Sequence, residues 1–185
     1  EYPDFYQALI DSILAFQVPF LEHLFESAEG KIDFLRVGDD YGTQQSLVMS
    51  PAMWRRFYQP SLRRMSEVGR RCGAHYYHHT CGAVKELIPD LIDTGVDVID
   101  PVQVSADGMN PSKLKSQFGD KVCFSGGVDE QHLLRKESPQ TVREEVFRLL
   151  DVMAKEGGYF MGPTHNFQAD IPTENILAMY QAAQD

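Results

Sequence analysis

The chain has 185 residues, of which 43% are hydrophobic, enough for one sizeable core in a single domain over residues 1–185. Its formal net charge of -10 argues against a nucleic-acid partner, because phosphates require a basic face. We find no unbroken run of ~18 apolar residues and no signal-peptide pattern, so we expect no membrane association. The 3 cysteines show no paired spacing, which predicts a reducing, cytoplasmic location.

The predicted elements alternate between helices and strands. In chain order they are a helix at 4–28, a strand at 32–37, a helix from 50 toward 73, a strand at 74–79, a helix at 84–95, a strand at 96–100, a short helix opening at 110, a strand at 121–127, a helix at 139–156, a strand at 158–162 and a helix at 173–183. Ser50-Pro51 and Ser138-Pro139 are typical helix starts, and Pro19 predicts a kink in the first helix.

Five apolar strands that alternate with helices predict an α/β fold with a parallel sheet. Polar, Gly-rich and Asp-rich segments follow these strands, as in the (β/α)8 TIM barrel, where the loops after the strands carry the chemistry. A complete barrel needs eight strands and ~250 residues, so we expect an incomplete barrel that lacks about three N-terminal strands. Its open edges favour association, including a homo-oligomer. An open, doubly wound sheet of five strands is the alternative.

Ligand-type side chains are concentrated in HYYHHTCGAV, residues 75–84. Because side chains alternate along a strand, we expect His79 and Cys81 to face one layer, and Tyr76 and His78 the other. An imidazole and a thiolate at a strand end suit zinc, although the pair alone is a weak signal and ordinary packing is the more common explanation. Cys72 and Cys123 fall within a helix and a strand, and are expected to be buried and inert.

Candidates for the rest of a site also follow strands. The best third donor is His165 in GPTHNFQAD, and the best carboxylates are Asp39 and Asp40 in GDDYGTQ. Asp100 closes the strand VDVID before a proline. Each residue also has an ordinary structural explanation: His165 as a loop histidine, the paired acids as turn formers and Asp100 as a hydrogen-bond acceptor.

Five segments together resemble the uroporphyrinogen decarboxylase superfamily, over nearly all of residues 32–183. They are VGDDYGTQQSLVMSPAMWRRFYQP, HTCGAV, DTGVDVIDPVQV, FSGGVDEQHLL and GPTHNFQADIPTENILAMYQA. The resemblance is specific in the order of the motifs, above all in the last block. It implies a (β/α)8 barrel, of which this chain looks like a C-terminal portion because chains of the family are about twice as long.

The resemblance implies two enzyme classes. Decarboxylases of the superfamily use no metal and hold the carboxylates of a tetrapyrrole with arginines. Methyltransferases bind zinc through His-x-Cys and a later cysteine, and exchange methyl groups between a corrinoid and an acceptor. This sequence has the methyltransferase-like His79-x-Cys81, but it places His165 where the later cysteine would be, a residue reminiscent of the decarboxylases. Asp39 and Asp40 disfavour an anionic porphyrinogen.

The leading hypothesis is a zinc-dependent methyltransferase that acts on a small-molecule substrate, with a corrinoid carried by a partner protein. Zinc is expected on His79, Cys81 and His165 with one open position. Asp39 or Asp40 would orient the substrate or complete the metal shell, and Asp100 would hold a ligand histidine. The alternatives are metal-free decarboxylation of a tetrapyrrole, with His165 and Asp40 near the reacting pyrrole, and a non-catalytic binding protein.

Overall fold

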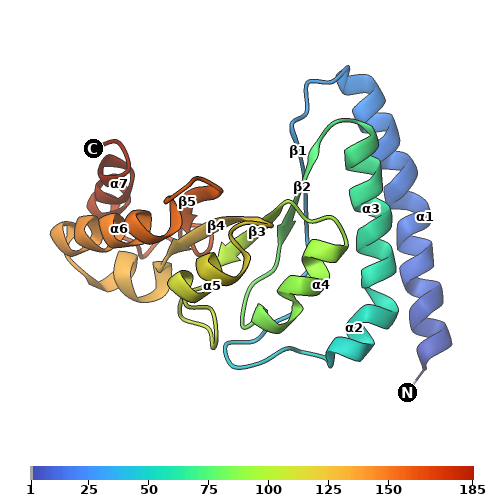
Figure 1. Cartoon of the computed structure of the whole chain (residues 1–185), viewed down its shortest axis with the longest axis horizontal. Coiled ribbons are helices and arrows are strands. Elements are labelled where there is room, and N and C mark those ends of the chain that lie inside the picture. Colours follow the sequence, from blue (N-terminus) through green and yellow to red (C-terminus); the bar gives the residue numbers. More distant parts are fainter. Residues whose placement is uncertain (1) are drawn as a thin grey trace.

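The computed structural model describes residues 2–185 as helices along one side of a single parallel sheet (Figure 1). The elements are α1 (Pro3–Ala28), β1 (Phe34–Gly38), α2 (Pro51–Phe57), α3 (Gln59–Arg71), β2 (His75–His79), η1 (Lys85–Leu87), α4 (Ile88–Asp93), β3 (Val98–Val102), α5 (Pro111–Phe118), β4 (Cys123–Val128), η2 (Glu130–Leu134), α6 (Pro139–Met153), β5 (Tyr159–Pro163) and α7 (Thr173–Ala182).

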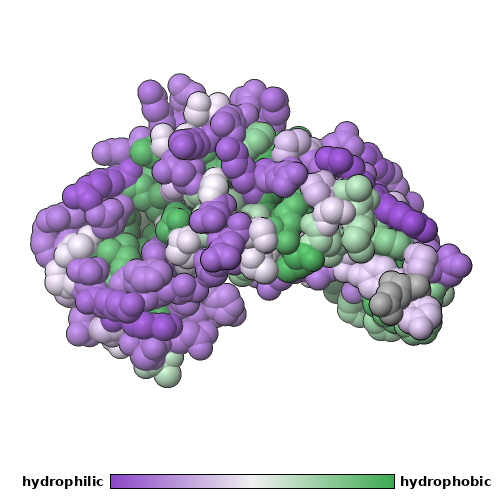
Figure 2. All heavy atoms as spheres, turned by 90° about the horizontal axis from the view of Figure 1, so that it is seen from below, coloured by the Kyte–Doolittle hydropathy of each residue, from purple (hydrophilic) through white to green (hydrophobic). Residues whose placement is uncertain are grey.

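The sheet confirms the predicted α/β architecture with five parallel strands. Their spatial order is the chain order, β1-β2-β3-β4-β5, so the sheet has no point at which the strand order reverses. A doubly wound sheet requires such a reversal, and the open-sheet alternative is therefore wrong. The sheet is strongly curved, because the rings of Phe34 on β1 and Phe160 on β5 approach to 5.9 Å. Figure 2 shows the resulting arch, which is hollow on one side.

Local sequence signals explain the starts of three helices, α2, α5 and α6. The side chains of Ser50, Asn110 and Ser138 each accept a hydrogen bond from a backbone N–H of the first helical turn, as expected of capping residues. The segment expected to be one helix from 50 toward 73 is two helices, because Pro60 has no N–H to continue the first one. Pro19, by contrast, lies inside α1, which continues as one element.

Alternation in β2 sorts its side chains onto two faces. Tyr76 and His78 are each 1% exposed and pack toward the helices, whereas Tyr77 and His79 lie on the other face. We call this second face the inner face, and its lining includes Arg36, Tyr77, His79, Asp100 and Ser125. The main apolar core lies on the opposite side of the sheet, between the strands and the helices.

The two remaining cysteines differ from the expectation that both are buried. Cys72 is exposed, because it lies at the C-cap of α3, where the helix reaches solvent. Cys123 is only half-buried at the start of β4.

The first helix contradicts the prediction that the chain has no apolar segment long enough to cross a bilayer. Pro3–Ala28 is long and apolar enough to cross a membrane by length and composition, and only 17% of its most apolar window is buried. The search for an unbroken apolar run missed this helix because Asp11, Ser12 and Gln17 interrupt the run. The finding is weak support for a span, because core helices of soluble proteins pass the same test, and one face of α1 packs on α3.

The fold predicts a large loss of stability on shortening Phe124, which is fully buried between β4 and the helices. We expect Phe124→Ala to lower the free energy of unfolding by about 3–5 kcal/mol, because the cavity left behind is only partly refilled. Urea unfolding followed by circular dichroism measures this loss. The control Leu177→Ala, at a side chain that is 53% exposed, should change stability by less than ~0.5 kcal/mol. Equal losses in the two variants would contradict the assigned core.

Candidate functional site

The candidate site lies where β1, β2 and β3 end. In the sheet register Gly38 is opposite His79, and His79 is opposite Asp100. Parallel pairing therefore brings the residues after β1 next to the end of β2, with Asp100 on the other side. This is the edge of the sheet at which α/β barrels carry their chemistry.

His79 is held between two acidic side chains and a thiol. Its Nδ1 lies 2.8 Å from Asp100 Oδ2, while its Nε2 lies 3.5 Å from Cys81 Sγ and 3.9 Å from Asp40 Oδ1. The hydrogen bond to Asp100, and after it that to Cys81, raises the pKa of His79 to about 9. Asp100 is the closest acceptor, so the Nδ1–H of His79 donates a hydrogen bond to Asp100. Nε2 is then directed at Cys81 and Asp40.

Asp100 is the most highly connected group of the inner face. It accepts hydrogen bonds from Arg36 Nη2 at 3.0 Å and from the Tyr77 hydroxyl at 3.1 Å, in addition to His79. Burial alone would raise the pKa of Asp100. The hydrogen bonds from His79, Arg36, Ser125 and Tyr77 outweigh this effect and lower the pKa to about 2. Asp100 is therefore a carboxylate that fixes the orientation of His79.

The loop after β1 is tied to the loop after β2. The backbone N–H of Cys81 donates to Asp40 Oδ1 at 2.8 Å, and that of Ala83 donates to the Thr43 carbonyl at 2.8 Å. From β3, Gln103 Oε1 accepts from the N–H of Gly82 at 2.7 Å. These contacts bring one oxygen, one nitrogen and one sulfur ligand atom, from Asp40, His79 and Cys81, within 4.8 Å of one another.

The three donors fit a zinc ion chemically. Zinc accepts carboxylate oxygen, imidazole nitrogen and thiolate sulfur at ~2.0–2.3 Å, so the ligand atoms of a tetrahedral site lie about 3.3–3.7 Å from one another. The 3.5 Å between His79 Nε2 and Cys81 Sγ agrees with this spacing, and the 3.9 Å from Nε2 to Asp40 Oδ1 is slightly longer. A carboxylate on the other nitrogen of the histidine, here Asp100, is the usual support for such a ligand.

His165 is not brought into this ligand group. Its exposed side chain has Nδ1 3.3 Å from the carbonyl of Asn166, although it lines the same cavity of about 540 Å³ as His79 and Asp40. The structure thus places Asp40 with the His-x-Cys pair, and leaves His165 in the same cavity but outside the ligand group. Asp39 also lines this cavity, and burial, with Asp40 second, raises its pKa.

Sequence reasoning did not identify Arg36, Tyr77, Ser125 and Gln103 as parts of the site. The signal for Arg36 was available, because Leu35 and Val37 alternate with it and pack toward the core, so Arg36 must face inward. Gln103 offered no comparable signal, because its partner is the backbone of a loop that is distant in sequence.

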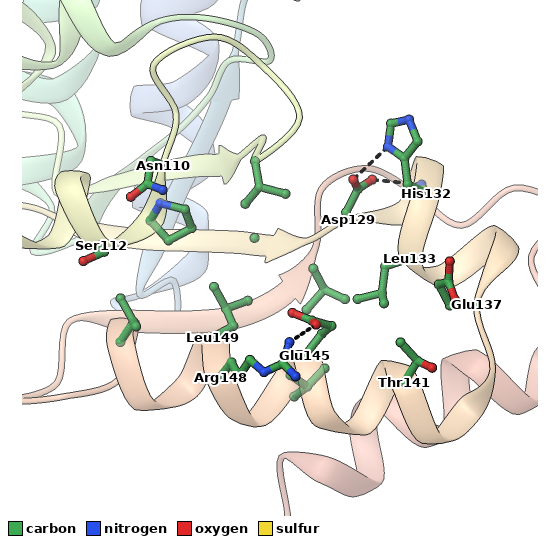
Figure 3. Close-up of a pocket in the computed structure, with 16 residues that line it drawn as sticks. Asn110, Ser112, Asp129, His132, Leu133, Glu137, Thr141, Glu145, Arg148 and Leu149 are labelled. Atoms are coloured by element: carbon green, nitrogen blue, oxygen red, sulfur yellow. Dashed lines mark hydrogen bonds and ion pairs between the residues drawn. The ribbon is translucent and has the colours of Figure 1, made fainter.

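A larger cavity lies elsewhere, between the end of β4, η2 and α6 (Figure 3), with a volume of about 720 Å³. The titratable side chains in Figure 3 pair mainly with each other. His132 Nδ1 lies 2.9 Å from Asp129 Oδ2, and Arg148 pairs with Glu145. In contrast to the cavity at the strand ends, it contains no group of metal-binding side chains among residues 2–185. We therefore place the functional site at the strand ends.

Comparisons with known proteins point to one family. The sequence matches the family described as Uroporphyrinogen decarboxylase (URO-D) over residues 1–185. It is 26% identical over 190 residues to the uroporphyrinogen decarboxylase of Psychromonas ingrahamii, covering 93% of this chain and 50% of that protein. The Thermus thermophilus uroporphyrinogen decarboxylase is 24% identical over 163 residues, or 88% of this chain and 44% of that protein. The chain thus spans about half the length of these curated relatives.

A solved structure described as a methyltransferase from Methanosarcina mazei is also similar, with a TM-score of 0.64 and 21% sequence identity. The similarity covers 82% of this chain and 42% of that one, and it shows a shared fold. The family match extends over the whole chain, and the site lies at the strand ends, where the barrel fold places its chemistry. The chain belongs to the uroporphyrinogen decarboxylase family.

Proposed function

We propose that the chain carries the catalytic centre of a zinc-dependent methyltransferase, which moves a methyl group between a corrinoid and a thiol or an O-methyl compound. The observation that supports this proposal most directly is the convergence of Asp40, His79 and Cys81 within 4.8 Å, with Asp100 behind the imidazole. An oxygen, a nitrogen and a sulfur ligand leave one position of a tetrahedral ion open, as catalytic zinc requires.

Each residue of the site has a separate role in the proposal. His79 Nε2 and Cys81 Sγ hold the ion together with either an Asp40 oxygen or His165, which lines the same cavity, so that one position stays open. Zinc supplies a Lewis acid that lets a thiol or an alcohol ionise near neutral pH. Asp100 keeps the imidazole of His79 in the orientation that presents Nε2.

The substrate is proposed to lie in the cavity of about 540 Å³ on the inner face, a size typical of small-molecule sites. Asp39 lines this cavity and is positioned to accept a hydrogen bond from the substrate. The acceptor sulfur or oxygen attacks the methyl carbon, and the electron pair of the broken bond stays with the corrinoid. We propose that a partner protein presents the corrinoid at the open side of the site.

Metal-free decarboxylation of a tetrapyrrole is the second candidate, because the curated relatives described above are uroporphyrinogen decarboxylases. In this reaction His165 and Asp40 would act beside the reacting pyrrole, and Arg36 is the arginine in the lining of this cavity. The Arg36 guanidinium is already paired with Asp100 at 3.0 Å, which leaves less positive charge for the carboxylates of a porphyrinogen. We therefore favour methyl transfer.

The metal content tests the proposed centre directly. Protein purified without chelator should hold about one zinc per chain, as expected of a single catalytic site. His79→Ala and Cys81→Ser should each abolish this content, because each removes a ligand atom. Cys123→Ser is the matched control, since Cys123 lies at the opposite end of its strand from the site and should leave the zinc in place. Reduced wild-type protein that stays metal-free after zinc is added would exclude the centre.

Asp100→Asn tests the support of the metal ligand. The amide keeps the size of the side chain but loses the charge that orients His79, so we expect zinc affinity to fall about 10–100-fold. Competition with a zinc chelator measures the affinity. The control Asp93→Asn removes a carboxylate that pairs with Arg63 on the outer helices, and it should leave the affinity unchanged. An unchanged affinity in Asp100→Asn would show that the carboxylate does not support a metal ligand.

His165→Cys distinguishes the two reactions. Thiolate is as good a zinc ligand as imidazole, so the variant should keep its zinc and part of its methyl transfer activity. In a decarboxylase the imidazole would bind or protonate the substrate, and a thiol cannot replace it there. The assays are demethylation of methylcobalamin by a panel of thiols and release of carbon dioxide from uroporphyrinogen. Decarboxylation by the wild type that is lost in His165→Cys would overturn the methyltransferase proposal.

A further inference from the structure

A further cavity, of about 510 Å³, adjoins the proposed metal centre, and we call it the Glu130 cavity. Asp40, Thr164 and His165 line both this cavity and the one on the inner face, and Cys81 lines the Glu130 cavity. The proposed ligand group therefore lies where the two cavities meet. A volume of this size is typical of small-molecule sites. The roles assigned above make no use of this second space.

Glu130 is a buried carboxylate in the lining of this cavity, and its charge is not fully compensated. The residue is 5% exposed, and its Oε2 has no hydrogen-bond partner among residues 2–185. Arg135 approaches the other oxygen, Oε1, only to 3.9 Å, and lies closer to Asp170, at 3.1 Å. A buried carboxylate is costly unless it is paired and hydrogen-bonded. Glu130 therefore lacks a donor that these residues do not supply.

The rest of the lining suits a cation. Besides the carboxylates of Asp40 and Glu130, it consists mainly of uncharged polar side chains, namely Thr43, Gln44, Gln103, Gln131, Thr164 and Gln168. It contains no lysine or arginine, and His165 is its single basic side chain. Such a lining attracts a positively charged group and repels a negatively charged one.

The position of Glu130 is fixed through its backbone. Its N–H donates a hydrogen bond to Thr164 Oγ1 at 3.2 Å, and the N–H of Thr164 donates to the Val128 carbonyl at 2.9 Å. Thr164 is itself only 4% exposed, and it directly precedes His165 in the chain. Because these contacts hold the Glu130 backbone in place before a ligand arrives, little ordering of the chain is needed on binding.

We propose that Glu130 binds an ammonium group of the substrate, so that the substrate is an amino thiol or an amino-substituted methyl ether. The inference rests on the proposed function, because the reacting sulfur or oxygen is taken to lie at the metal centre. The ammonium group extends from there into the Glu130 cavity and donates a hydrogen bond to the carboxylate. Its charge compensates Glu130, whereas a neutral substrate leaves the buried carboxylate without its donor.

Matched thiols test the ammonium site. 2-Aminoethanethiol and 2-mercaptoethanol differ only in the group at the far end, as do their three-carbon counterparts. We expect the protein to bind the amines about 10–100-fold more tightly than the alcohols, as a hydrogen bond to a charged group predicts. Isothermal titration calorimetry measures the dissociation constants. Glu130→Gln should remove the preference. The control Glu137→Gln should keep it, because Glu137 is exposed and lies outside the lining of this cavity.

The melting temperature separates recognition of a ligand from a structural role. Removal of an uncompensated buried charge should leave the melting temperature of Glu130→Gln unchanged or raise it. A marked decrease would assign Glu130 to its ion pair with Arg135 and overturn the proposal. Equal affinities of the wild type for amines and alcohols would also overturn it, as would a preference that survives in Glu130→Gln.

A thiol-free ligand separates this site from the metal centre. 2-Methoxyethylamine carries the ammonium group, and 1,2-dimethoxyethane is its neutral counterpart. The wild type should prefer the amine both with zinc and after treatment with a chelator, and Glu130→Gln should not. A preference for the amine in protein that binds no zinc would support the ammonium site and exclude only the metal centre. Zinc-loaded protein without this preference would leave the proposed methyltransferase standing and overturn the role of Glu130.

Discussion

The candidate site depends on one hydrogen bond between two loops, from the Cys81 N–H to the Asp40 carboxylate. The loops approach backbone to backbone at this point. Gly82 has a φ of +91°, and a Cβ on it would lie 2.4 Å from the carbonyl carbon of Gly42, so no larger residue fits there. The Asp40 carboxylate both anchors the Cys81 loop and faces His79. The Asp40 oxygen and the Cys81 sulfur therefore cannot move independently of each other.

A second constraint comes from the charge of Asp100. Asp100 is only 8% exposed, and burying a carboxylate is costly unless partners compensate its charge. Arg36 from β1 and His79 and Tyr77 from β2 contact it directly. Ser125 from β4 contacts the Tyr77 hydroxyl. With Asp100 itself on β3, these contacts connect four strands of the sheet. The orientation of His79 is thus determined by side chains of neighbouring strands rather than by β2 alone.

Much of this arrangement could be predicted from local pattern. Alternation along HYYHH sorted His79 from His78, and the end of VDVID located Asp100. Which of the adjacent acids turns toward Cys81 could not be predicted, because a tertiary hydrogen bond decides it. The same limit applies to His165, whose loop after β5 has no periodic pattern to orient its side chains. In α1, periodicity predicted the helix, but the face that packs is set by contact with α3.

The balance of charge in the cavity separates the two candidate reactions. Asp39, Asp40 and Asp100 line it together with Arg36 and His79. Arg36 and His79 both contact Asp100, and His79 also lies 3.9 Å from Asp40, so two cationic side chains face three carboxyl groups in this lining. A bound divalent cation would remove this excess of negative charge, whereas a substrate with several carboxylates would add to it. Burial, and after it the repulsion from Asp40, raises the pKa of Asp39, and this repulsion is the same excess acting on a single group.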